Sequence, residues 1–300
     1  MKWEQFFSIV ELRTKVISLS TVAIALCFTV YSGFDIDPLR LTLLIPAVLF
    51  VDMGTTAFNT LFDFLKGTDA ADTNKEADKV LVHRNVSPNA ALWAGLGCYA
   101  AAAVCGALLS MLTGWQIAAA GAVSMVIGAA YTAGPFPISR GPLGELFAGG
   151  FLGTVLFCIV FFVFAGTVTL RAVLVSLPSF FVIASVLTAN NTCDTEGDRK
   201  NGRKTLSILL GPARAKAFVY GLGIMGFLVL AAYYYYGVVP ATVRFPLGFC
   251  LFGVFWVYRK MHALGFSHKT KSSIMQLETV IVMLLTLAVT GGYLWYFAIT

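Results

Sequence analysis

The chain has 300 residues, of which 58% are hydrophobic and 12% are charged. That composition is too apolar for an ordinary soluble domain and is typical of a polytopic membrane protein. The net charge of +6 could suggest a nucleic-acid partner, but the basic residues gather in alternate loops between apolar stretches. The sequence therefore predicts an all-α protein of the lipid bilayer and excludes nucleic-acid binding.

Nine apolar stretches follow one another along the chain. Each is long enough for a helix that crosses a bilayer, and their length favours helices over strands. We expect membrane helices at residues 16–34, 41–62, 90–112, 115–133, 147–166, 171–191, 215–236, 239–258 and 277–297.

The basic residues predict the orientation of these helices. If the loops are assigned alternately to the two sides of the membrane, 18 of the 21 Lys and Arg fall on the side of the N-terminus. Basic loops stay in the cytoplasm. We therefore expect a multi-pass protein of the cell membrane, with a cytoplasmic N-terminus.

Two acidic clusters stand at the ends of apolar stretches, on the predicted cytoplasmic side. The first contains Asn59-x-x-x-Asp63 and the second Asn190-x-x-x-Asp194, 131 residues later. Carboxylates at a membrane boundary cost free energy and are functional candidates. We interpret the duplication as a weak internal repeat, with halves near 1–135 and 136–300 of one domain around one central cavity.

The acids fall on shared helix faces. Asp52, Asn59 and Asp63 are spaced at i, i+7 and i+11, which places them on one face. Asn190, Asp194 and Asp198 share a stripe if the sixth helix continues to Asp198, although Gly197 could end it. Carboxylate and amide oxygens suit Mg²⁺, which binds through one or two carboxylates together with substrate phosphates.

The alternative interpretation of these acids is helix capping and loop solubility, which the duplicated spacing and the shared faces argue against. We keep that interpretation for Asp72, Glu76, Asp78 and Glu196, and we expect His83, His262 and His268 to be ordinary loop residues. Basic residues follow each acidic cluster. Metal, cations and an apolar cavity together predict a substrate with a diphosphate head and a long apolar tail.

At this point the residues match a known pattern. The chain resembles the UbiA superfamily of intramembrane aromatic prenyltransferases, and more narrowly its MenA branch, which acts on 1,4-dihydroxy-2-naphthoate in menaquinone and demethylmenaquinone biosynthesis. Three segments carry the resemblance: Asn59-x-x-x-Asp63-x-x-x-Gly67-x-Asp69, Tyr131-Thr-x-Gly134-Pro135…Gly144-Glu145, and Asn190-Asn191-x-x-Asp194-x-Glu-x-Asp198-Arg199…Gly202-Arg203-Lys204-Thr205-Leu206…Leu210-Gly211.

The resemblance implies a bundle of nine helices around a cytoplasm-facing active site, an allylic polyprenyl diphosphate donor, an aromatic acid acceptor and two Mg²⁺ ions that bridge to the diphosphate. It also implies residue roles. The predicted metal ligands are Asn59, Asp63, Asp69, Asn190, Asp194 and Asp198. The predicted catalytic residues are Asp63, Asp194, Asp198 and Tyr131. The predicted substrate-binding residues are Asn59, Asn190, Asn191, Lys204, Arg140, Arg84 and Asp52.

Three residues depart from the branch. Cys193 stands where the branch has Arg, and Asp52 and Thr56 stand where it has Gln and Asn. Asp52 lies deeper in the membrane than the metal motif, where the acceptor could bind. These departures leave open another acceptor, namely 4-hydroxybenzoate, homogentisate or a different naphthoate. An alternative from another class is a membrane transporter, which would also explain acids inside a helical bundle.

Overall fold

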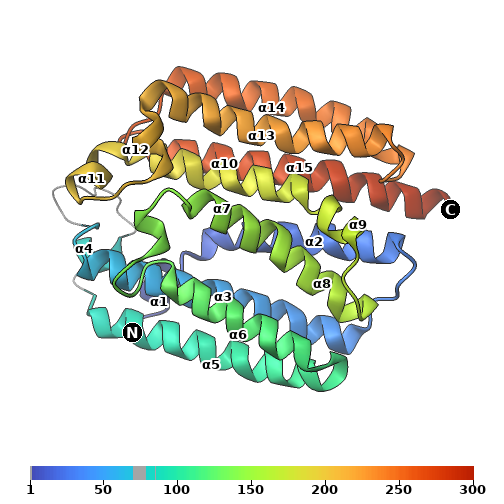
Figure 1. Ribbon diagram of the computed structural model, residues 1–300, viewed down its shortest axis with the longest axis horizontal. Helices are drawn as coiled ribbons and strands as arrows, with labels where there is room; N and C mark the ends of the chain where they lie inside the picture. Colours follow the sequence, from blue (N-terminus) through green and yellow to red (C-terminus); the bar gives the residue numbers. More distant parts are fainter. Residues whose placement is uncertain (1, 70–78, 85) are drawn as a thin grey trace. The chain divides into compact units, whose positions relative to one another are not determined.

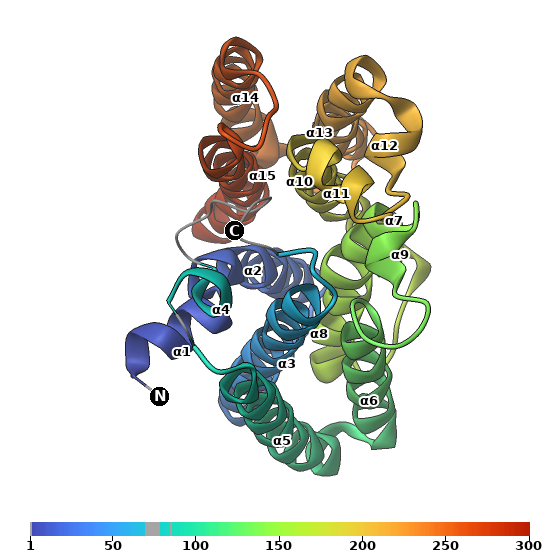
Figure 2. The same cartoon turned by 90° about the vertical axis from the view of Figure 1, so that its left-hand side faces the viewer.

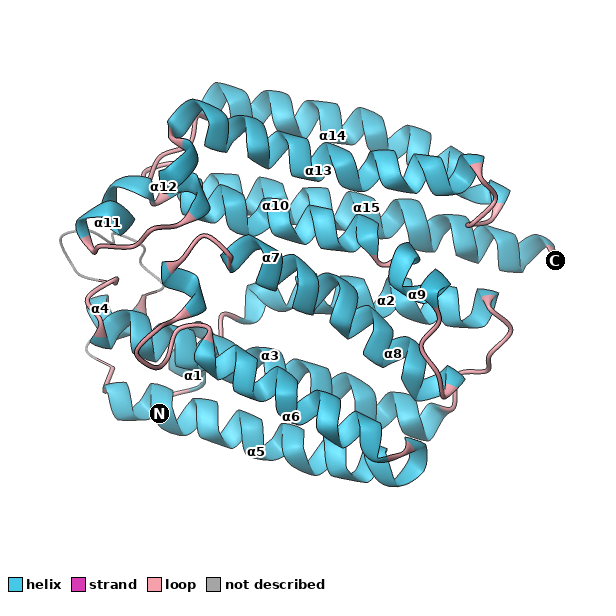
Figure 3. Ribbon diagram, in the orientation of Figure 1, coloured by secondary structure: helices cyan, strands magenta, loops and turns pink. Residues whose placement is uncertain are grey.

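The structure is a computed structural model that describes residues 2–69, 79–84 and 86–300, and within these residues it contains helices and no strand (Figure 3). The elements of the first part are α1 (Trp3–Ile9), η1 (Leu12–Lys15), α2 (Val16–Tyr31), α3 (Pro38–Leu65), α4 (Val80–His83), α5 (Pro88–Thr113), α6 (Trp115–Ala130), η2 (Ile138–Arg140), α7 (Gly144–Ala148) and the π-helical η3 (Gly149–Val155). The remaining elements are α8 (Leu156–Ala165), α9 (Leu170–Val175), α10 (Leu177–Cys193), α11 (Thr195–Lys200), α12 (Leu206–Leu210), α13 (Pro212–Tyr235), η4 (Ala241–Val243), α14 (Arg244–Leu264) and α15 (Lys271–Ile299). The all-α prediction is confirmed for this part of the chain.

Each of the nine predicted stretches coincides with helix. Among the described residues, eight helical segments are long and apolar enough to cross a membrane. The remaining stretch forms α6, an apolar helix of 16 residues, which is shorter than a usual span. The count of nine spans and the cytoplasmic N-terminus therefore stay predictions.

The helices form two compact units that alternate along the sequence. Unit 1 comprises Met1–Lys15, Pro38–Gly144 and Thr195–Thr205, and unit 2 comprises Val16–Asp37, Glu145–Asp194 and Leu206–Thr300. The boundary at Asp194 and Thr195 divides the second acidic cluster between the units. The single domain with halves near residue 135 stays a prediction.

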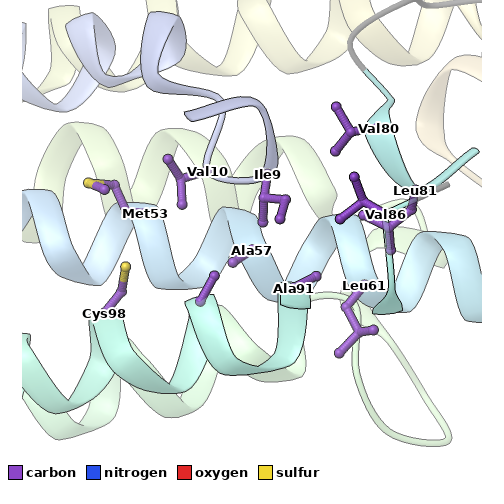
Figure 4. Packing of buried hydrophobic residues seen from close by; sticks show 11 residues of the cluster. Ile9, Val10, Met53, Ala57, Leu61, Val80, Leu81, Val86, Ala91 and Cys98 are labelled. Atoms are coloured by element: carbon purple, nitrogen blue, oxygen red, sulfur yellow. The ribbon is translucent and has the colours of Figure 1, made fainter. Parts of the chain in front are cut away.

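Unit 1 is built on the long helix α3, which packs against α5 and α6 (Figures 1 and 2). Gly54 of α3 lets Tyr99 of α5 lie against the α3 backbone, where any Cβ would overlap its ring. The N-terminal segment and α4 cover α3 and α5 through buried apolar side chains (Figure 4). Ile9, Val10, Met53 and Ala57 belong to this cluster, so the segment that leads to Lys15 is fixed on α3.

Unit 2 is centred on α10, which contacts α13, α15 and η3 (Figure 2). A Cβ at Gly153 of η3 would overlap the Phe180 backbone, so glycine lets the π-helical turn lie directly on α10. The condition for a stripe from Asn190 to Asp198 is not met. The helix ends at Cys193, before Gly197, Asp194 is its C-cap with φ −96° and ψ 4°, and a separate helix, α11, starts at Thr195. Asp198 therefore does not lie on the helix that carries Asn190.

Candidate functional site

The first acidic motif lies on the last turns of α3 in unit 1. The Asn59 side chain accepts a hydrogen bond from Thr132 Oγ1 at 2.9 Å. Lys66 Nζ donates to the carbonyl oxygens of Thr132 at 2.6 Å and Gly134 at 3.0 Å. These bonds tie the loop after α6 to the end of α3, which places the predicted catalytic residue Tyr131 beside the motif.

Three carboxylates gather around this end of α3. The Asp63 carboxylate interacts electrostatically with those of Asp69 and Asp198 and with the cations of Arg203 and Lys79. The backbone N–H of Asp69 donates to the carbonyl of Asp63 at 3.1 Å, which turns the chain back onto the helix. Lys79 Nζ lies 3.5 Å from Asp69 Oδ2. Unit 1 therefore combines both residues of the first motif with one acid from the second.

Asp198 is buried in α11 and forms an ion pair with Arg203, whose Nη1 lies 2.8 Å from Asp198 Oδ1. Arg203 also donates to the Ser139 carbonyl through Nε at 3.2 Å and Nη2 at 2.7 Å. Burial alone would lower the pKa of Arg203, but Asp198 and Asp63 outweigh it and raise that pKa. Tyr131 also interacts electrostatically with this guanidinium, so Arg203 is a permanent cation at the centre of the cluster.

The other predicted basic residues of unit 1 are Arg84, which follows α4, Arg140, which ends η2, and Lys204, which lies between α11 and α12 (Figure 1). The Arg140 guanidinium donates to the Asn201 carbonyl, and the Arg140 carbonyl accepts from the Lys204 backbone N–H at 2.8 Å. Burial and the charge of Arg140 lower the pKa of Lys66. The Lys204 and Arg84 side chains are exposed. Arg140 is therefore close to the acidic cluster, while Lys204 and Arg84 are open to solvent.

The rest of the second motif lies at the end of α10 in unit 2. Lys271 Nζ is 2.7 Å from Asp194 Oδ2, and His268 Nδ1 is 3.1 Å from Asp194 Oδ1. Burial would raise the pKa of Asp194, but Lys271 and then His268 outweigh it and hold that pKa below its ordinary value. Asn190 is half-buried one turn before Asp194.

Asn191 points to a different partner. It is buried, and its Nδ2 donates to Glu145 Oε1 of α7 at 2.9 Å. Asn191 therefore links α10 to the start of α7. Its predicted substrate contact stays a prediction.

Asp52, the predicted site residue nearest the middle of α3, lies next to a lysine. Lys15 Nζ is 2.5 Å from Asp52 Oδ1 and donates to Thr56 Oγ1 at 2.7 Å. Lys15, His268 and Lys271 were not among the predicted site residues. A buried acid needs a cationic partner, and this need was the only signal in the sequence for Lys15 and Lys271.

The donor chemistry of the acids fits Mg²⁺. Within the described ranges, no group of three His, Cys, Asp or Glu residues lies close enough to hold a metal ion by itself. Mg²⁺ is usually bound through one or two carboxylates plus substrate phosphates and waters. Carboxylates beside buried cations, with amide oxygens nearby, suit that mode of binding. Asp72, Glu76 and Asp78 lie outside the described residues, and Glu196 is exposed.

Comparisons with known proteins agree with this chemistry. The UbiA prenyltransferase family matches residues 18–276. The 1,4-dihydroxy-2-naphthoate octaprenyltransferase of Bacillus subtilis (strain 168) is 34% identical over 176 residues, which cover 59% of this chain and 56% of that protein. Human UbiA prenyltransferase domain-containing protein 1 is 27% identical over 216 residues, which cover 71% and 63%. The chain thus matches a little over half to under two thirds of the length of these relatives.

Solved structures share the fold. The apo structure of a UbiA homologue from Aeropyrum pernix K1 aligns with a TM-score of 0.71 at 18% identity, covering 95% of this chain and 98% of that one. A UbiA homologue from Archaeoglobus fulgidus, bound to DMAPP and Mg²⁺, aligns with a TM-score of 0.65 at 15% identity and covers 96% and 99%. At these identities the likeness concerns the fold alone.

Proposed function

Because the chain belongs to the UbiA prenyltransferase family, we propose that it transfers a polyprenyl chain from an allylic diphosphate to an aromatic acceptor in an Mg²⁺-dependent reaction. The observation that carries the proposal is the cluster in unit 1, where Asp63, Asp69 and Asp198 lie among Arg203 and Lys79. Such an arrangement suits a polyanion that arrives with its metal ions. We propose that this multi-pass membrane protein lies in the cell membrane and that its site faces the cytoplasm.

The proposed acceptor is 1,4-dihydroxy-2-naphthoate, in menaquinone or demethylmenaquinone biosynthesis. Its support is the Bacillus subtilis relative of that name. A donor diphosphate with Mg²⁺ is supported by the Archaeoglobus fulgidus homologue, which was solved with DMAPP and Mg²⁺.

The metal would be held by the oxygen ligands of both motifs. In unit 1 these are Asn59, Asp63, Asp69 and Asp198, and in unit 2 they are Asn190 and Asp194. We propose two ions. When bound, Mg²⁺ withdraws electron density from the diphosphate and so makes it a better leaving group.

The remaining steps depend on the protein's own side chains. Arg203 stays protonated, so it can balance the negative charge that grows on the departing diphosphate, and Arg140 and Lys204 add charge nearby. Tyr131 offers an aromatic face to the allylic cation. The apolar helices keep water from that cation and hold the prenyl tail. Attack by an electron-rich ring carbon on the allylic cation then forms the new C–C bond. With 1,4-dihydroxy-2-naphthoate as acceptor, loss of its carboxylate as CO₂ returns the electron pair to the ring and restores the aromatic system.

Two other functions remain as alternatives. Another aromatic acid could be the acceptor, because residues 52 and 56 depart from the MenA branch. A transporter would also place acids in a helical bundle, but it does not require carboxylates paired with buried cations at one helix end.

Pyrophosphate release separates the enzyme from the transporter. Purified protein with Mg²⁺, geranyl diphosphate and a mixture of aromatic acids should release pyrophosphate, and EDTA should stop the release. A transporter would release none and would instead move solute across the membrane of proteoliposomes, and that result would overturn the proposal.

A further inference from the structure

A buried ion pair lies inside unit 1, apart from the acidic cluster. The side chains of Lys15 and Asp52 are only 4% and 14% exposed, and their charged atoms are 2.5 Å apart. Thr56 completes the group, since its Oγ1 accepts from Lys15 Nζ at 2.7 Å and donates to the Asp52 carbonyl at 2.9 Å. We name these three residues the Lys15–Asp52–Thr56 triad.

Stability alone does not account for the triad. Taking two charges out of water costs several kcal/mol per ion, and hydrophobic residues of similar volume often serve stability as well or better. Ionisable side chains within a membrane helix are costly and usually functional. The pair therefore calls for a role that an apolar pair could not fill.

The position of the triad on α3 points to that role. Asp52, Thr56, Asn59 and Asp63 lie within about 60° of one another around the helix at 3.6 residues per turn. Thr56 precedes Asn59 by about 4.5 Å along the axis, and Asp52 precedes it by about 10 Å, at 1.5 Å per residue. Asp52 and Thr56 thus lie one to two turns from the first motif toward the middle of α3 and on the same face, within reach of an acceptor whose ring carbon meets the donor at the motif.

The charges of the triad define what it can bind. Lys15 is the more buried partner and directs its ammonium at Asp52 and Thr56, so the pair is neutral as a whole. Asp52 is the more exposed partner, and an ionised carboxylate only accepts hydrogen bonds. A hydroxyl group can donate to it, whereas a second carboxylate would be repelled.

We propose that Asp52 accepts a hydrogen bond from a ring hydroxyl of the aromatic acceptor. Lys15 is a positioning residue that holds the Asp52 carboxylate in place through its bonds to Asp52 and Thr56. The proposal rests on the proposed prenyl transfer and adds the group of the acceptor that this chain recognises. It places the acceptor's hydroxyl, and not its carboxylate, beside Asp52 near the middle of α3.

Equilibrium binding tests the proposal without turnover. The probes are 1,4-dihydroxy-2-naphthoate, kept anaerobic, and 2-naphthoate, which has the same carboxylate and no hydroxyl. Isothermal calorimetry on purified protein should give at least a 10-fold tighter Kd for the dihydroxy compound. The variants are Asp52→Leu and the double variant Lys15→Met with Asp52→Leu, which removes both charges and leaves no unpaired lysine.

In each variant, the Kd values for the two probes should differ by no more than about 3-fold, because the variant loses affinity for the dihydroxy compound. Thr55→Val is the matched control, because Thr55 is on the same turn but its hydroxyl contacts Tyr99 of α5. It should keep the wild-type ratio. A folded double variant that still prefers the dihydroxy compound 10-fold, or a wild-type protein without that preference, would overturn the proposal.

Pyrophosphate release by the same preparation separates this inference from the proposed function. If the wild-type protein consumes geranyl diphosphate with an aromatic acid but the double variant keeps the hydroxyl preference, only the role of the triad is wrong. If no acceptor supports release by the wild-type protein, both are wrong.

Discussion

Replacing Lys271 with methionine should destabilise unit 2 and expose how Asp194 is held. Lys271 Nζ lies 2.7 Å from Asp194 Oδ2, and the two side chains are 9% and 19% exposed. Removing one partner of a buried pair costs about 3–5 kcal/mol because the other charge stays buried. His268 remains 3.1 Å from Asp194, so we expect a loss near the lower limit, about 3 kcal/mol.

The assay is a double-mutant cycle of unfolding free energies in detergent, with Lys271→Met, Asp194→Asn and the double variant. The double variant should recover most of the loss, since it leaves no unpaired charge. Lys269→Met is the matched control, because Lys269 is an exposed neighbour, and it should change the stability by less than about 0.5 kcal/mol. Equal effects of Lys269→Met and Lys271→Met would refute the reasoning.

Three further predictions concern Asp194, the Arg203–Asp198 pair and Asp63. Acidification should destabilise the wild-type protein as the pH falls through the lowered pKa of Asp194, because the stability from that carboxylate is present above its ordinary pKa. In Lys271→Met, burial would instead raise the pKa of Asp194, so a thermal melt series should show that the stability deficit of the variant shrinks as the pH falls. Arg203→Met should cost about 3 kcal/mol of unfolding free energy through loss of its ion pair with the buried Asp198, while Arg199→Met, at an exposed position, should cost little. Asp63→Asn should lower pyrophosphate release at least about 100-fold with unfolding unchanged within about 1 kcal/mol, and unaltered release would contradict its place in the site.

The helices were predictable because each follows from a local property. A run of about 20 apolar residues has to satisfy its backbone hydrogen bonds within the helix in a bilayer, and all nine predicted stretches are helical. Helix ends were less predictable. The last helix begins at Lys271, six residues before its predicted start, and the bond of Lys271 to Asp194 joins residues far apart in the sequence.

Candidate site residues could be predicted from the repeated sequence motif, but the side chains that pair with them could not. The duplicated Asn-x-x-x-Asp spacing makes Asp63 and Asp194 candidates without any contact information, and their roles stay predictions. The sequence left open where α10 ends. Asp198 is paired with Arg203, which in turn donates to the Ser139 carbonyl, and no residue of α10 predicts these contacts. Lys15 stands 37 residues from Asp52, and only tertiary structure brings such a pair together.

The most direct test of prenyl transfer is product analysis by mass spectrometry. Purified protein would receive Mg²⁺, a set of prenyl diphosphates, 1,4-dihydroxy-2-naphthoate and competing aromatic acids, beside Asp63→Ala, Asp194→Ala and an EDTA control. We predict a prenylated naphthoquinol without its carboxylate, absent from both variants and from the EDTA sample. Folded wild-type protein that prenylates none of the acceptors would contradict the account.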